Sequence, residues 1–164
     1  MVIKPSASGL LGHPCHHYIP FPSDLNLHQS VTSNHDEMTR KGADPMKLPG
    51  PDHPITITAN PKRVRVTADG IVIAETTHAL TLKEASYPAV QYIPRQDANM
   101  ALLARTERTT HCPYKGDASY FSIKANGKTL DNAIWTYETP FPAMTEISGH
   151  LAFYPDKVKI EEVA

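Results

Sequence analysis

The sequence predicts a mainly β protein: a compact single domain of short antiparallel strands, barrel-like or sandwich-like, with two short helices and a loosely structured N-terminal extension. After Pro54, short runs of alternating apolar and polar residues follow one another, separated by turn residues. The dipeptides Asp69-Gly70 and Asn126-Gly127 stand between such runs and are typical of two-residue hairpin turns. With 164 residues, the chain is long enough for one hydrophobic core.

Residues 1–45 differ from the rest in composition. They are rich in Pro, Ser, Asn and His and show no sustained hydrophobic periodicity. We therefore expect an extension over 1–45 and a folded domain over 46–164. Because Met46 opens the stretch "MKLPGPDHP", we hypothesise that the native translation start lies near it.

The strands are expected in the runs that alternate, and the helices where capping residues occur. A helix over 97–104 would begin at Asp97, whose carboxylate can accept from the free amides of the first turn. A second, over 140–149, has Pro142 in its first turn and Gly149 past its end. The strand-forming segments are, in order, 55–58, the hairpin 63–76, 78–82, 89–93, the hairpin 120–130, 132–138, 150–155 and 157–162.

Charge and composition exclude several classes of partner. The 16 basic and 17 acidic residues give a net charge of -1, so no strong field attracts nucleic acid or an anionic membrane. No apolar run reaches the length of a membrane span and no secretory signal is present. The two cysteines, Cys15 and Cys112, lie far apart and a disulfide is not expected. We expect a cytoplasmic protein with no nucleic-acid or membrane partner.

The stretch "HCPYKG" at 111–116 concentrates reactive side chains. If it is extended, Cys112 and Tyr114 face one side while His111 and Lys115 face the other, so His111 is poorly placed as the base for Cys112. Cys112 is then either a nucleophile or a small buried apolar residue. Lys115 and Gly116 can together meet a phosphate or carboxylate, although no phosphate-loop motif surrounds them.

Arg95 and the aromatic residues supply further candidates. Arg95 follows Pro94 at the end of a strand, a suitable corner for an anion-binding guanidinium; the alternative is a surface pair with Asp97 or Glu84. The aromatic side chains either line a polar cleft or belong to the core. They are Tyr87, Tyr92, Tyr114, Tyr120, Trp135, Tyr137 and Tyr154.

The cluster "HPCHHY" in the extension has the soft ligands of a zinc or copper site. Cys112 with His111 could complete a four-ligand shell, but the spacing of His13, Cys15, His16 and His17 matches no standard ligand pair. We therefore predict no native metal site, and no sequence motif indicates which cofactor, if any, the protein binds.

Several longer motifs carry a resemblance to a known family. In order, they are "LPGPDHPITI", "ASYPAVQYIPRQDANMALL", "TTHCPYKGDASYFSI", "NAIWTYETP" and "HLAFYPDKV". Over residues 46–162 the chain resembles domain of unknown function 427, which is also catalogued as nucleotidyltransferase-like. The resemblance implies a compact, mostly β domain and no established reaction. Its signature falls on Tyr92, Arg95, His111, Cys112, Pro113, Tyr114, Lys115, Gly116, Tyr120, Trp135, Tyr137 and Tyr154.

These observations favour a small-molecule-binding domain, with enzymatic activity left open. Arg95 and Lys115 would hold an anionic group in one cleft, and the catalytic candidates are His111, Cys112 and Lys115. The expected ligand-binding residues are Tyr92, Arg95, Tyr114, Gly116, Tyr120, Trp135 and Tyr137. An alternative is a protein-interaction or homodimerisation module with a tyrosine-rich face. Nucleotidyl transfer is a third, but no paired carboxylates for magnesium occur on adjacent strand positions.

Overall fold

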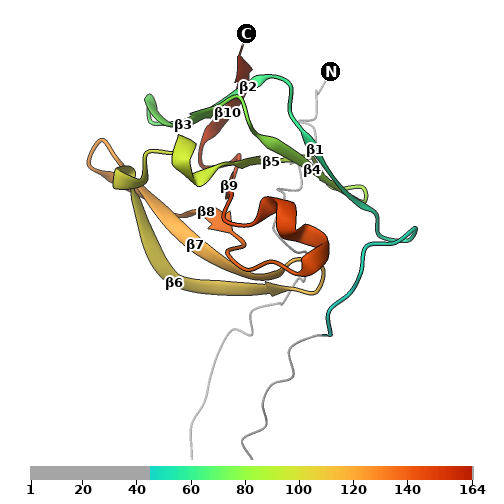
Figure 1. The fold of residues 1–164 in the computed structure, drawn as a ribbon. Helices are drawn as coiled ribbons and strands as arrows, with labels where there is room; N and C mark the ends of the chain where they lie inside the picture. Colours follow the sequence, from blue (N-terminus) through green and yellow to red (C-terminus); the bar gives the residue numbers. More distant parts are fainter. Residues whose placement is uncertain (1–44, 164) are drawn as a thin grey trace, which may run out of the picture.

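Two antiparallel sheets make up the described part of the chain, and the prediction of a mainly β domain is confirmed (Figure 1). The structure is a computed structural model that describes residues 45–163. The larger sheet has the strand order β1 (Ile55–Ala59), β4 (Leu80–Glu84), β5 (Val90–Ile93), β9 (Leu151–Phe153), β8 (Lys128–Thr136), β7 (Gly116–Ala125) and β6 (Leu103–Cys112). The smaller has the order β10 (Lys159–Val163), β2 (Arg63–Ala68) and β3 (Ile71–Thr76). The extension and its histidine cluster lie outside the described residues.

The two hairpins predicted from their turn dipeptides are confirmed. Asp69 and Gly70 connect β2 to β3 with φ values of 48° and 81°. Asn126 and Gly127 connect β7 to β8 with φ values of 50° and 70°. Both dipeptides therefore adopt the left-handed conformation that glycine and asparagine tolerate at low cost.

The helices are short 3-10 segments: η1 (Arg95–Asp97), η2 (Met100–Leu102) and η3 (Pro142–Ile147). The continuous helix predicted over 97–104 is wrong. Asp97 caps no helix there, because its Oδ2 accepts a hydrogen bond from Thr76 Oγ1 at 2.6 Å instead. The predicted helix at 140–149 corresponds to η3, with proline in its first turn and Gly149 at φ 68° after its end.

Strand β6 was not identified from the sequence. It is ten residues long and pairs with β7 at one edge of the larger sheet. Its sequence, "LARTERTTHC", lacks apolar alternation because most of its side chains are partly or fully exposed. Strand assignment from hydrophobic pattern fails where neither face of a strand is deeply buried.

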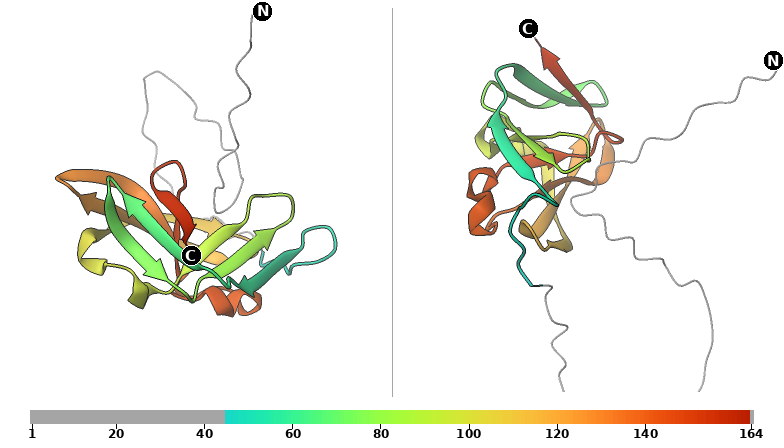
Figure 2. Two further views of the ribbon diagram at one scale, coloured as in Figure 1. Left: turned by 90° about the horizontal axis from the view of Figure 1, so that it is seen from above. Right: turned by 90° about the vertical axis from the view of Figure 1, so that its right-hand side faces the viewer.

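The larger sheet packs on both faces, and the views in Figure 2 show the smaller sheet covering one of them. Between the sheets, Val66 and Ile73 pack with Ile123 and Ile134. On the other face lie buried aromatic rings, with Met144 and Ile147 of η3 packed against them. Alternation along β8 sends Ile134 to the first cluster and Trp135 to the second. No helix within residues 45–163 has the length and apolar character to cross a membrane.

Candidate functional site

The connection between β6 and β7 holds a buried cation. Residues 113–115 form a turn, closed by a backbone hydrogen bond of 3.2 Å from Lys115 N to the Cys112 carbonyl. Gly116 follows with φ 99°, a conformation that favours glycine. The turn directs the ammonium of Lys115 inward, and the residue is only 2% exposed.

Glu84, at the end of β4, neutralises this ammonium. Its Oε2 lies 2.6 Å from Lys115 Nζ, and its Oε1 lies 2.8 Å from His53 Nε2. The imidazole of His53 stacks on the ring of Tyr114, with ring centroids 4.1 Å apart. Burial lowers the pKa of Lys115, whereas the neighbouring carboxylate of Glu84 opposes that shift. The predicted alternation is wrong for Lys115, whose ammonium lies on the side of Cys112, because a turn replaces the extended backbone.

Cys112 lies beside Lys115 but does not offer a free thiol. Its Sγ is 3.8 Å from Lys115 Nζ, and the residue is 2% exposed. The cysteine is disulfide-bonded, in contrast to the expectation from the sequence. In this state the sulfur is not available as the nucleophile that the sequence suggested.

His111 faces away from the sulfur of Cys112, as predicted from the alternation of an extended strand. Its Nδ1 lies 2.6 Å from Asp117 Oδ1, across the hairpin. The edge of its ring contacts Phe141, with centroids 6.1 Å apart. The Nε2 atom is buried, and no hydrogen-bond partner within the described residues reaches it. The structure therefore does not pair His111 with Cys112 as base and nucleophile.

Most of the aromatic candidates are buried in the second core cluster rather than arranged around an open cleft. Trp135 Nε1 donates to the Tyr92 hydroxyl at 3.3 Å, and the two rings meet edge to face. The Tyr120 hydroxyl lies 2.8 Å from Thr110 Oγ1. Burial raises the pKa of Tyr92 and that of Tyr137. The sequence allowed these rings to line a polar cleft or to belong to the core. This arrangement fits the core, with the polar atoms of the rings hydrogen-bonded inside it.

Arg95 occupies the corner after β5 and enters a cluster of three charged side chains. Its Nη2 lies 3.2 Å from Glu138 Oε1, so its partner is neither Asp97 nor Glu84. Arg105 of β6 binds the same carboxylate through both Nη atoms, at 2.8 and 2.9 Å. The hydrogen bond from Arg105, with a smaller contribution from Arg95, lowers the pKa of Glu138 to about 2.

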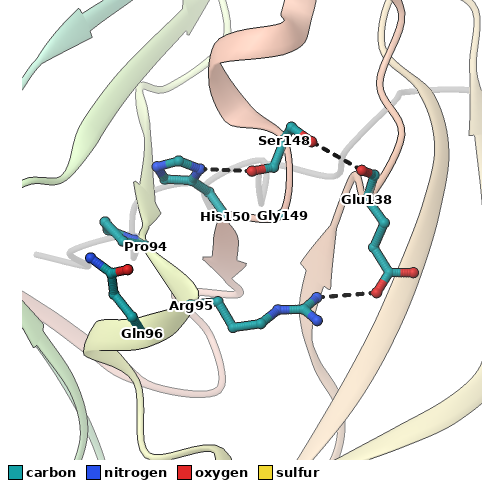
Figure 3. Close-up of a pocket in the computed structure, with 7 residues that line it drawn as sticks. All are labelled: Pro94, Arg95, Gln96, Glu138, Ser148, Gly149 and His150. Carbon is teal, nitrogen blue, oxygen red and sulfur yellow. Dashed lines mark hydrogen bonds and ion pairs between the residues drawn. The ribbon is translucent and has the colours of Figure 1, made fainter.

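The guanidinium of Arg95 borders a pocket of about 440 Å³ (Figure 3). The pocket lies between the β5 corner and the segment that joins η3 to β9. Its lining residues are Pro94, Arg95, Gln96, Glu138, Ser148, Gly149 and His150. Opposite Arg95, the imidazole of His150 is held by the Ser148 carbonyl at 3.1 Å from its Nδ1.

The structure thus separates candidates that the sequence placed in one cleft. None of residues 111–116 lines the pocket beside Arg95. Lys115 is instead committed to Glu84 in the interior. Sequence reasoning missed Glu84 and Glu138 as site residues and did not place His150 in this pocket, since an isolated charged or polar residue carries no local sign of its distant partner.

The comparison with protein families accounts for the sequence motifs. A family model described as Domain of unknown function (DUF427), labelled NTP_transf_9, matches residues 56–164. The chain belongs to the DUF427 family. No curated protein matches the sequence. Within the described residues of this DUF427 domain, no three or more His, Cys, Asp or Glu side chains gather in a way that could hold a metal ion.

Proposed function

We propose that this DUF427 domain binds a small anionic molecule in the pocket beside Arg95. The observation that carries the proposal is the half-exposed guanidinium at the border of a pocket of about 440 Å³, a volume within the usual range for small ligands. The side chain of Arg95 is 38% exposed, so it can reach a ligand without unfolding its surroundings.

Charge supports an anion over a cation as the ligand. Glu138 does not serve Arg95 alone, because Arg105, which does not line the pocket, makes two hydrogen bonds to the same carboxylate and Arg95 makes one. The hydrogen bond from Arg105 is the largest cause of the lowered Glu138 pKa, so the guanidinium of Arg95 keeps hydrogen-bonding capacity for a ligand. A ligand carboxylate or phosphate can accept from the guanidinium, and such charge-assisted hydrogen bonds are stronger than neutral ones.

Lys115 has a different role in this proposal. Its ammonium is buried and already compensated by Glu84, so we assign it to the stability of the fold rather than to the ligand. Catalytic roles for His111, Cys112 and Lys115, and a cytoplasmic location, stay predictions from the sequence.

The alternatives receive less support. A partner-binding or homodimer face made of tyrosines would need exposed rings, whereas Tyr92, Tyr120 and Tyr137 are buried. Nucleotidyl transfer requires binding of nucleotide with magnesium. A rise in melting temperature with nucleotide and magnesium together, absent with either alone, would revive that alternative.

The proposal is tested by isothermal titration calorimetry with a panel of small carboxylates and phosphates. Arg95→Gln should weaken binding about tenfold or more, since a hydrogen bond to a charged group is worth about 1.5–3 kcal/mol. Arg65→Gln is the matched control, because Arg65 also pairs with a glutamate, Glu75, but does not line this pocket. Anion binding that survives Arg95→Gln unchanged would refute the proposal.

A further inference from the structure

The pocket beside Arg95 has two chemically different ends (Figure 3). At one end, the guanidinium of Arg95 meets Glu138. At the other, the imidazole of His150 and the side-chain amide of Gln96 lie on the same side of the pocket as Pro94. Ser148 ties the two ends together, since its hydroxyl donates to the Glu138 carbonyl at 3.0 Å while its own carbonyl holds His150.

The contact with Ser148 determines which nitrogen of His150 can accept a hydrogen bond from a ligand. A carbonyl oxygen only accepts, so the Nδ1 atom that lies 3.1 Å from the Ser148 carbonyl must carry hydrogen. In the neutral imidazole, Nε2 then has the free lone pair. Figure 3 shows Nε2 directed away from Ser148, toward the side of Pro94 and Gln96. His150 therefore offers a hydrogen-bond acceptor to a ligand group at this end.

The two ends require different groups on one ligand. At the charged end, Arg95 shares the Glu138 carboxylate with Arg105, so its guanidinium keeps donors for a single anionic group. An acceptor nitrogen beside an uncharged amide suits a hydroxyl, which donates to the imidazole and accepts from the amide. A second anion at this end would face the lone pair of Nε2 rather than a hydrogen.

We propose that the ligand is a hydroxy acid, such as a sugar acid, with its carboxylate at Arg95 and a hydroxyl at His150 Nε2. This assignment rests on the proposed function and narrows it to one chemical class. It adds His150 as a residue that determines specificity, whereas Arg95 provides most of the affinity for the anion.

Isothermal titration calorimetry of the full chain with three probes tests the assignment. Gluconate carries both groups, hexanoate has a carboxylate on a carbon chain of the same length without hydroxyls, and sorbitol has hydroxyls without the carboxylate. We expect gluconate to bind at least about fivefold more tightly than hexanoate, as one to two neutral hydrogen bonds would produce. Sorbitol should show no measurable binding.

Two variants of His150 isolate the Nε2 atom. In His150→Asn, the amide nitrogen can replace Nδ1 as donor to Ser148, but nothing replaces Nε2; the preference for gluconate over hexanoate should disappear. In His150→Gln, the amide reaches the position of Nε2, so part of the preference should return. Hexanoate affinity should stay the same in both variants, which separates a specificity role from a loss of structure.

The outcomes distinguish this inference from the proposed function. Equal binding of gluconate and hexanoate, with both weakened by Arg95→Gln, would leave anion binding in place and overturn the hydroxy acid. A gluconate preference that persists in His150→Asn would also overturn it. Failure of every anionic probe to bind the wild-type protein, or binding that ignores Arg95→Gln, would overturn both proposals.

Discussion

Glu84 and Glu138 each accept from two basic side chains, yet their surroundings differ. Glu84 binds Lys115 through one oxygen and His53 through the other. Glu138 binds Arg105 and Arg95. The side chains of Glu84 and Lys115 are 13% and 2% exposed, whereas those of Glu138 and Arg95 are 36% and 38% exposed.

This difference in burial separates a structural ion pair from the cluster that we propose as a binding site. The charges of Lys115 and Glu84 have lost their hydration, so each depends on the other and neither is open to a ligand. The guanidinium of Arg95 keeps contact with solvent and shares its carboxylate with Arg105, so it retains capacity to bind an anion. The same kind of pair thus stabilises the interior in one place and leaves a binding group in the other.

The largest effect is expected when the buried pair is broken. Lys115→Met leaves the carboxylate of Glu84 without its buried counter-charge, which should lower the free energy of unfolding by about 3–5 kcal/mol. Urea unfolding followed by circular dichroism measures the change. The double variant Lys115→Met/Glu84→Met is the control and should recover most of the loss, because no buried charge remains. A loss below about 1 kcal/mol in the single variant would show that the two regions do not differ as described.

The buried phenols beside this pair should make the fold sensitive to alkali. Burial raises the pKa of Tyr92 and of Tyr137, so the folded protein retains these protons at a pH where the unfolded chain, with an ordinary pKa of 10.0, releases them. Their contribution to stability is complete below pH 10 and falls as the pH rises above it, by about 1.4 kcal/mol per pH unit for each phenol.

Urea unfolding at a series of alkaline pH values tests this sensitivity. Tyr92→Phe should reduce the slope by one proton relative to wild type, and the comparison cancels the titration of Lys115 present in both proteins. A native-state rise in tyrosinate absorbance that becomes smaller in Tyr92→Phe would contradict the assignment of this ring to a closed core, since the difference would come from Tyr92 itself.

The exposed cluster should contribute least to stability. The side chain of Arg105 is 53% exposed, so Arg105→Ala should lower the free energy of unfolding by less than about 1 kcal/mol.

The lowered pKa of Glu138 makes the ionised carboxylate stabilise the fold at pH values above its ordinary pKa of 4.5, and this contribution is lost as the pH falls toward about 2. Glu138→Gln should therefore flatten the stability profile in that acid range. Thermal unfolding at several pH values measures both effects, and a loss as large as that of Lys115→Met would remove the contrast.

Sequence reasoning succeeded where the cause of the structure was local. The turns at Asp69-Gly70 and Asn126-Gly127 follow from backbone preferences of these residues, and the opposite orientation of His111 and Cys112 follows from strand alternation. It failed at β6, whose exposed side chains give no apolar signal, and at residues 97–104, where good helix formers are held in short 3-10 turns and the start of a strand.

The candidate site was predicted only in part. Arg95 was expected at a corner that binds anions, and the structure places it at the border of a pocket. Its partner Glu138 is 43 positions away in the chain, and that of Lys115, Glu84, is 31 positions away. In each pair, the two residues belong to or follow strands that are not adjacent in the larger sheet, so only the fold of the whole sheet brings them together, and no local pattern encodes it.

By itself, the sequence determined the mainly β class, the family and the positions of the hairpin turns, because dihedral preferences and alternation act over a few neighbouring residues. The tertiary structure decided that Lys115 lies in the interior with Glu84 and that Arg95 faces a pocket with Glu138 and His150. The physical reason is that burial and charge pairing depend on which distant segments of the chain meet in the folded domain, and the exposure of each basic group then sets whether it stabilises the core or remains accessible to a ligand.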